Sequence, residues 1–477
     1  MIRTSRPWFD CDREAALMAM LSAGVAAPAK GEPQGLLRHF IPRRVRNDEF
    51  ALFSSCSAMP LLDWAYETCE APYHYVINGQ DRGDVKNLLV ELKRLFHEKL
   101  LKAISAPPGT KMLVASSPAD AFRIAAMLFT LACDGEPMRW LAPSFGELGS
   151  DVPAGMRGHV VRPGEDHGDA LLADNIEVVE ISLRQARGEF IDDADIAETY
   201  RRHQRASGGR SIGLLTFGDA TGAAGPLAMQ ADMIDATQMR VRASRIADFL
   251  KLGYPTVISG STFLGGPLPS GALLVPPNTF GETVMNQAAE LLAEDTGLNW
   301  KSGLGFSRGF GNMLRWMPGL HALEQFVDLG PKADIRMAQM TMELKDFLAE
   351  FPDFEGFESR HIHHVAFCGR DSGIVPFAVR RGKRGWMSMP ELIGLYDTLA
   401  AQNVLLGLPI TIGNRAALRL SLAAGDISVG SIAHKLGRLA DALETVGFHR
   451  RRRVSSESGS LLHAARATCR PDGICLQ

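Results

Sequence analysis

Residues 234–276 read IDATQMRVRASRIADFLKLGYPTVISGSTFLGGPLPSGALLVP, and this stretch decides the fold. It predicts a short strand carrying Asp235 and Gln238, then a helix, then a second strand from Thr256 to Ser259. A strand, a helix and a strand within about thirty residues form a βαβ crossover, the unit of parallel sheets. Ligands of such sheets bind at the carboxyl ends of the strands. We therefore expect Asp235, Gln238 and the turn Ser259–Thr262 to face one crevice.

This pattern resembles the cofactor-binding centre of fold-type I pyridoxal-phosphate (PLP) enzymes, in particular the class V aminotransferase group that includes cysteine desulfurases and kynureninases. The resemblance implies that Asp235 pairs with the pyridinium nitrogen and that Gln238 lies beside the ring hydroxyl. It implies that the turn containing Ser259 and Ser261 ends at the position of the Schiff-base lysine, which here is Thr262. A hydroxyl cannot form an imine, so we expect no aldimine chemistry from this position.

Strands and helices alternate on both sides of this stretch. The sequence predicts strands at 111–116, 139–142, 176–183 and 211–217, and helices at 84–104, 121–133 and 191–207. The fold class expected is α/β, with a fold-type I PLP-transferase-like large domain that has a mostly parallel sheet, and a smaller α+β C-terminal domain. The expected divisions are an N-terminal arm at 1–60, the large domain at 61–316, the small domain at 317–448 and a flexible Arg/Ser-rich tail at 449–477.

The small domain is expected to begin with one long helix from about Met317 and to contain strands at 374–379 and 417–421. The resemblance implies that Arg419, in the Leu-Arg-Leu-Ser strand, binds a substrate carboxylate, and a guanidinium suits a carboxylate. A structural ion pair is the alternative. No cysteine lies between Gly382 and Leu418, where the resemblance places the nucleophile of desulfurases, so desulfurase activity is not expected.

Ser117-Pro118-Ala119-Asp120 is a strong helix start, with a serine cap and proline at the first helical position. The resemblance makes this start the phosphate cup, where backbone amides hold the anion. Pro118 and Ala119 stand where that family has a glycine and a hydroxyl residue. Two lost donors weaken anion binding, at roughly 1.5–3 kcal/mol for each charge-assisted hydrogen bond. A capped helix without any ligand is the alternative interpretation.

Several loops carry further candidates. They are Ser54–Ser57 in the N-terminal arm, Phe145 and Glu147 after a strand, Asp219–Gly222 beside the expected crevice, and Lys301 and Arg308 in a Gly-rich segment, where the resemblance makes Arg308 an anion contact. For each of them an ordinary loop is the alternative. The histidines at 361, 363 and 364 have no distant partner at ligand spacing, so no metal site is expected.

Composition limits the class of protein. The 477 residues are 46% hydrophobic and 22% charged with a net charge of −3, which favours a soluble, cytoplasmic protein that binds neither nucleic acid nor membrane. The seven cysteines are scattered, which argues against a disulfide framework. Cys469 and Cys475 lie six residues apart in the tail, where a redox pair, a soft-metal site and an unremarkable terminus are all open interpretations.

Three functional hypotheses remain, the third being a carrier whose cysteine-containing tail is the working part. The first is a degenerate class V aminotransferase-like protein that acts as a binding, regulatory or structural subunit, as a homodimer or with a lysine-bearing paralogue whose site it completes. The second is an enzyme of amino-acid or natural-product metabolism. It would bind PLP or pyridoxamine phosphate (PMP) without a covalent bond and act on a small carboxylate or amino acid, or it would recruit Lys251 or Lys301 as a replacement amine.

Overall fold

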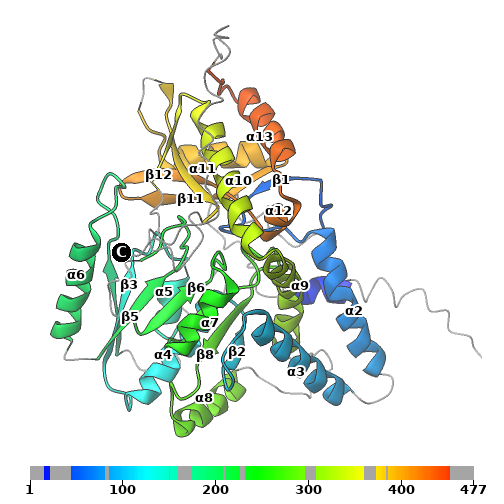
Figure 1. The fold of residues 1–477 in the computed structure, drawn as a ribbon, viewed down its shortest axis with the longest axis vertical. Helices are drawn as coiled ribbons and strands as arrows, with labels where there is room; N and C mark the ends of the chain where they lie inside the picture. The colour runs from blue at the N-terminus through cyan, green and yellow to red at the C-terminus, as the bar shows by residue number, and fades with distance from the viewer. Residues whose placement is uncertain are drawn as a thin grey trace, which may run out of the picture.

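The computed structural model describes residues 15–21, 44–80, 85–149, 151–159, 175–207, 210–225, 231–295, 308–358, 372–382 and 385–451. Two sheets organise these residues, a larger one in the lower half of Figure 1 and a smaller one above it. The strands of the larger sheet are β2 Lys111–Ala115, β3 Met138–Pro143, β4 Ile176–Ile181, β5 Ser211–Thr216, β6 Met233–Ala236, β7 Thr256–Ile258 and β8 Gly271–Val275.

The smaller sheet combines strands from opposite ends of the chain. They are β1 Ala51–Phe53, β9 Phe354–Gly356, β10 Ile374–Val379, β11 Val404–Ile412 and β12 Arg415–Ser421. The helices from residue 63 onward, within the described ranges, are α2 Asp63–Gln80, α3 Val85–Ala103, α4 Pro118–Ala132, α5 Val152–Met156, α6 Asp193–Ala206, α7 Ala243–Lys251, α8 Glu282–Asp295, α9 Arg308–Asp328, α10 Pro331–Ala349, α11 Met389–Ala400, α12 Ala424–Val429 and α13 Ala433–Thr445.

The larger sheet has the strand order β2-β8-β7-β6-β5-β3-β4. Strands β4, β3, β5, β6 and β7 pair in parallel, and β8 runs antiparallel between β7 and β2. The predicted βαβ crossover is confirmed, because β6 and β7 pair in parallel with α7 between them. All strands except β8 therefore bring their carboxyl ends to one edge of the sheet.

Successive residues of the central strands enter two different cores. Met233 of β6 and Val257 of β7 pack in the core formed with α4, whereas Ile234 and Ile258 pack in the opposite core, which also contains Phe249 of α7. Alternation with period two places neighbours on opposite faces of a strand. Because both faces are apolar, both are covered, as in α/β proteins with parallel sheets.

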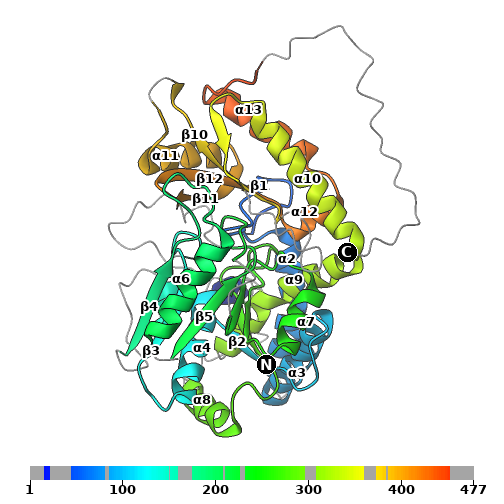
Figure 2. The same ribbon diagram turned by 60° about the vertical axis from the view of Figure 1, so that its left-hand side comes forward.

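The N-terminal segment belongs to the smaller sheet. Strand β1 pairs in parallel with β11, with Ala51 opposite Val404, and Figures 1 and 2 show it in blue among the orange strands of the C-terminal part. The prediction of a single long helix from about Met317 is wrong. Two helices cover this region, α9, which begins at Arg308, and α10. Gly330 separates the two helices with φ at +53°, and Pro331 then opens α10.

Candidate functional site

Thr262 lies beside the residues that follow β6. Its hydroxyl donates a hydrogen bond to the main-chain oxygen of Thr237 at 3.1 Å. The amide of Thr237 in turn donates to Oδ1 of Asp235 at 2.9 Å. The turn after β7 and the carboxyl end of β6 therefore meet at one edge of the sheet, and Thr262 is buried there.

Ser259 and Ser261 stabilise this turn. The hydroxyl of Ser259 donates to the main-chain oxygen of Ser270 at 2.7 Å and lies 3.0 Å from the hydroxyl of Ser261. The amide of Ser261 also donates to Oγ of Ser259 at 3.2 Å. Both side chains are buried. Their hydroxyls are thus engaged within the protein.

Asp235 is a buried carboxylate near the centre of the sheet. Burial raises its pKa, and hydrogen bonds from Thr237 oppose the shift. Thr216 is its register partner on the parallel strand β5, so the two side chains project side by side from one face. The hydroxyl of Thr216 is buried and has no hydrogen-bond partner among the described residues. Asp235 and Thr216 together could accept a polar group at this edge.

The start of α4 is occupied by its own side chains. Ser117 caps the helix, because its Oγ accepts from the amide of Asp120 at 3.0 Å. The Asp120 carboxylate accepts from the amide and hydroxyl of Ser116 at 2.9 and 3.0 Å, and it pairs with Arg123 at 2.7 Å. Two of the side-chain donors at this helix start, the Ser116 hydroxyl and the Arg123 guanidinium, are therefore engaged by Asp120.

Two glycines, Gly155 of α5 and Gly271 of β8, allow their backbone segments to approach the same helix start closely. A Cβ added to Gly155 would lie 2.1 Å from the oxygen of Ala119, and one added to Gly271 would lie 2.2 Å from the oxygen of Ser117. Ala119 is only 4% exposed. Pro118 has no amide hydrogen to donate. This helix start offers an anion fewer donors than an ordinary one does.

Gln238 contacts the N-terminal segment. Its Nε2 donates to the main-chain oxygen of Cys56 at 3.1 Å, and its Oε1 lies 3.5 Å from Nε of Arg240. The amide group that the resemblance places beside a ring hydroxyl is thus engaged with residues of this chain.

Arg240, two positions after Gln238, is fully buried at a junction of three parts of the chain. It donates to Oγ of Ser55 at 2.9 Å and to the main-chain oxygens of Ser372 at 3.0 Å and Leu422 at 2.8 Å. Burial lowers its pKa to about 10. Nothing in the sequence marks this arginine as buried, since its partners are mostly main-chain oxygens far along the chain.

Arg419 makes a similar set of contacts from β12. Its Nη1 donates to the main-chain oxygen of Ala220 at 2.6 Å, and its Nη2 donates to Oγ of Ser57 at 2.7 Å and to the oxygen of Leu408 at 2.6 Å. The side chain is buried. The guanidinium that the resemblance assigns to a substrate carboxylate here joins the small sheet to the large domain and the N-terminal segment.

A buried charged cluster lies beside Ala220. Arg184, directly after β4, pairs with Glu147 at 2.8 Å and donates to Oγ1 of Thr221 at 3.3 Å. Oδ1 of Asp219 accepts from the amide and hydroxyl of Thr221, at 2.7 and 2.8 Å, and from the amide of Ala223 at 2.9 Å. Glu147 and Asp219 stand among the sequence candidates. Arg184 does not, although its place at the carboxyl end of a parallel strand was a usable signal.

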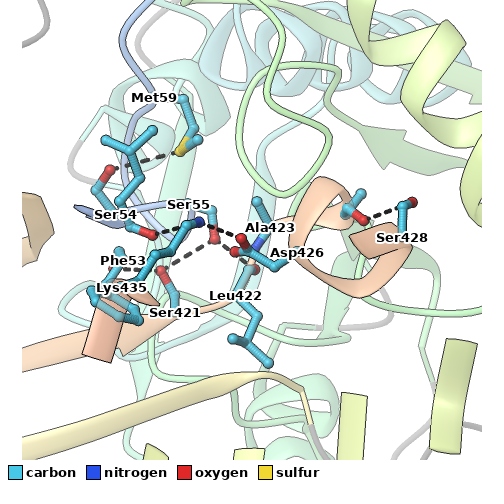
Figure 3. A network of polar contacts seen from close by, with 12 residues as sticks. Phe53, Ser54, Ser55, Met59, Ser421, Leu422, Ala423, Asp426, Ser428 and Lys435 are labelled. Atoms are coloured by element: carbon cyan, nitrogen blue, oxygen red, sulfur yellow. Dashed lines mark hydrogen bonds and ion pairs between the residues drawn. The ribbon is translucent and has the colours of Figure 1, made fainter. Parts of the chain in front are cut away.

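The N-terminal segment is fastened to the small sheet by a network of polar contacts. Figure 3 shows Ser54, Ser55, Ser421, Asp426 and Lys435 within it. Ser421 donates from Oγ to the oxygen of Phe53 at 2.8 Å and accepts from the amide of Cys56 at 3.0 Å. Asp426 pairs with Lys435, which also donates to the oxygen of Leu52 at 3.3 Å. Residues 52–56 are therefore held against β12 and α13.

Other candidates lie elsewhere. Lys251 is exposed, pairs with Asp248 at 3.3 Å and ends α7, the helix that runs back from the carboxyl edge of the sheet. Arg308 is the first residue of α9, and its side chain is outside the described part. The residues that fall outside the described ranges are Lys301, the histidines at 361, 363 and 364, Cys469 and Cys475.

Within the described ranges, no helix is long and apolar enough to span a membrane, and no three metal-binding side chains gather.

No protein-family model matches the sequence, and no curated protein matches it. Solved structures do match, over most of the chain. The Escherichia coli cysteine desulfurase CsdA, in its S-sulfonic acid form, has a TM-score of 0.51 at 16% identity, covering 83% of this chain and 96% of its own. The chain has the fold of the fold-type I PLP enzymes.

Two further structures with this fold are decarboxylase-like. Catharanthus roseus tryptophan decarboxylase in complex with L-tryptophan has a TM-score of 0.52 at 14% identity, covering 94% of this chain and 89% of its own. Oryza sativa TDC with PLP and tryptamine has a TM-score of 0.51 at 15% identity, with 93% and 89% covered. Identities this low show the fold alone.

PLP fits the residues present at only one of the three places where the resemblance expects it to be anchored. The buried Asp235 carboxylate beside the unpartnered Thr216 hydroxyl suits the expected ring nitrogen. Where the resemblance expects the lysine, however, Thr262 has no amine and donates to Thr237. Where the resemblance expects the phosphate, Asp120 accepts from Ser116, and Ser117 accepts from the amide of Asp120. We therefore derive no reaction step through PLP.

Proposed function

We propose that this chain is a fold-type I subunit without aldimine chemistry, which acts as a binding, regulatory or structural subunit. It works as a homodimer or completes the site of a lysine-bearing paralogue. The observation that carries the proposal is the hydrogen bond from Thr262 to Thr237, two residues beyond Asp235. The short side chain at the position expected for the lysine is directed to the backbone and supplies no nucleophilic amine.

The arginines of the crevice support this proposal. Arg240 and Arg419 direct their donors to main-chain oxygens and serine hydroxyls that join the N-terminal segment, the large domain and the small sheet. A guanidinium committed in this way stabilises the relative position of three segments. Binding a substrate carboxylate would require it to exchange those contacts.

A second candidate function is favoured by Asp235 and Thr216. A buried carboxylate whose pKa is raised, next to an unpartnered hydroxyl, is suited to a protonated ring nitrogen. On this alternative the chain is an enzyme that holds PLP or PMP without a covalent bond. Lys251 does not support a replacement imine, because it is exposed and paired with Asp248 on α7.

Addition of PLP to the purified full-length chain tests the proposal. We expect no visible imine band, and no lysine trapped by borohydride when the protein is digested and its peptides are weighed. Calorimetry with PMP tests non-covalent binding in the same preparation, and we expect no saturable heat. An imine trapped at any one lysine, or saturable PMP binding lost in Asp235→Asn, would overturn the proposal in favour of the second candidate.

The partner is tested separately. Native mass measurement of the protein taken from its own host gives the subunit composition directly. A homodimer or a complex with a lysine-bearing chain of the same fold agrees with the proposal, whereas a monomer carrying bound coenzyme contradicts it.

A further inference from the structure

The loop after β5 is folded on itself by one carboxylate. Phe217 bridges to Ala224, and the amide of Asp219 donates to the oxygen of Ala223 at 2.9 Å. Oδ1 of Asp219 accepts three hydrogen bonds from within the loop. Oδ2 of the same carboxylate is buried and has no hydrogen-bond partner among the described residues. The loop geometry therefore depends on Asp219, but half of its carboxylate is without a partner.

This loop also contacts the small sheet and the residues that precede it. The amide of Ala220 donates to the oxygen of Glu147 at 3.0 Å, and the oxygen of Ala220 accepts from Arg419 at 2.6 Å. Gly222, with φ at +82°, approaches the start of β10 so closely that a Cβ there would lie 2.2 Å from Oγ of Ser372. Two consecutive stretches of the loop thus contact the small domain.

We propose that residues 219–223 and Arg419 form an interdomain latch that closes with uptake of one proton at Asp219. The latch then holds the small domain more firmly in mildly acidic than in neutral solution.

The direction of the pH dependence of latch closure follows from the environment of Asp219. Burial raises its pKa from the model-compound value of 3.8 to about 6, and the hydrogen bonds from Thr221 and Ala223 and the charge of Arg184 oppose that rise. In an open loop the carboxylate is solvated and has its ordinary value. A group with the higher pKa in the closed form binds a proton on closing, so acid favours closure between these two values. The ratio of closed to open molecules is expected to rise about tenfold from pH 8 to pH 5.

The charged groups around Asp219 come from every element packed against the loop. They are Glu147 after β3, Arg184 after β4, Asp235 on β6, Arg240 after β6 and Arg419 on β12. Arg184 directs its hydrogen bonds to Glu147 and Thr221 rather than to Asp219. Burial also raises the pKa of Asp235. The test therefore distinguishes the effect of Asp219 from that of Asp235.

Hydrogen–deuterium exchange of the full-length chain tests the latch. Amide protection of residues 217–225, corrected for the intrinsic rate at each pH, is expected to be about tenfold greater at pH 5 than at pH 8, with the increase beginning near pH 6. In Asp219→Asn this pH dependence is expected to vanish. In Asp235→Asn and in Asp232→Asn it is expected to persist. Asp232 is the matched control, because it is a half-buried carboxylate directly before β6, its pKa is also raised by burial, and it accepts from the amide of Gly213.

The second part of the experiment disrupts the contacts between this loop and the small domain. Arg419→Gln and Gly222→Ala are expected to lower protection of residues 217–225 at both pH values while the larger sheet keeps its protection. If the amide protection of residues 217–225 in the wild-type chain does not change with pH, or falls in acid, the proposal is wrong whatever the variants show. The proposal is also wrong if Asp219→Asn keeps the wild-type pH dependence, or if only Asp235→Asn abolishes it.

Discussion

Nη1 of Arg419, on the small sheet, donates a 2.6 Å hydrogen bond to the main-chain oxygen of Ala220, in a loop of the large domain 199 residues earlier in the sequence. The same guanidinium reaches Ser57 of the N-terminal segment. One side chain therefore joins three segments around the crevice, and the predictions below concern the residues that surround this junction.

Restoring an amine at the turn after β7 should restore reactivity with an aldehyde. In Thr262→Lys the new side chain starts beside Thr237 and Asp235, so pyridoxal should form an imine that borohydride traps at residue 262. Because Pro118 has no amide hydrogen and Asp120 engages the Ser116 hydroxyl and Arg123 at the α4 start, PLP should bind no more than about threefold better than pyridoxal, less than one charge-assisted hydrogen bond provides. Absorbance titration measures both affinities.

Thr262→Met is the matched control, since it has an unbranched side chain without an amine. Both variants add atoms to a buried position and should lose about 1–3 kcal/mol of unfolding free energy. An imine at some other lysine in Thr262→Met would show that residue 262 is not the relevant position.

Removing Arg184 should strongly destabilise the large domain. Arg184→Met removes the ion pair of the buried Glu147 with Arg184 and the hydrogen bond that Arg184 donates to Thr221. Breaking a buried pair from one side costs about 3–5 kcal/mol. Urea unfolding followed by circular dichroism measures the loss. Arg139→Met is the control, because Arg139 and Glu177 form a partly exposed pair at 2.7 Å, worth about 0–1 kcal/mol. Equal losses in the two variants would contradict the assigned role.

Filling the space at Gly155 should disturb the start of α4. In Gly155→Ala the new methyl group meets the oxygen of Ala119 at 2.1 Å, so either α5 or α4 must shift, at a cost of about 1–3 kcal/mol. Thermal unfolding measures the change. Gly437→Ala is the control within α13, where nothing lies within 4 Å of the added carbon, and it should stabilise by about 0.5–1 kcal/mol. A neutral Gly155→Ala would mean that the two helices are not held this closely.

Removing the hydroxyl of Ser421 should loosen the N-terminal segment. Ser421→Ala leaves the buried amide of Cys56 without an acceptor and the oxygen of Phe53 without a donor. A buried group left unsatisfied costs about 1–3 kcal/mol. Proteolysis near residues 51–57 should accelerate correspondingly. Ser428→Ala removes only a hydrogen bond within α12 and serves as the control; equal proteolysis of both variants would count against the network.

Much of the large domain could be predicted from the sequence because its signals are local. The strands β6 and β7 and the helix α7 follow from β-branched and amphipathic patterns within residues 234–259. Strand β1 could not be predicted in this way, since it has three residues and its register partners begin at Val404. The break between α9 and α10 had a local signal in Gly330 and Pro331, which the helical periodicity on both sides obscured.

The residues of the candidate site also differ in whether a local sequence signal locates them. Asp235, Thr262 and the capped start of α4 could be located from short motifs and their spacing. Arg184 was missed although its place after a parallel strand was a usable signal. Arg240 could not be located, because an arginine that binds mainly main-chain oxygens leaves no complementary charge in the sequence. Burial of such a residue is decided by the packing of distant segments.

The parallel pairing of β1 with β11 has a consequence for biosynthesis. The ribosome makes residues 51–53 roughly 350 residues before their partner strand exists. The edge that β1 will cover is thus absent while the intervening residues emerge, and the small sheet cannot be completed before β11 and β12 have been made.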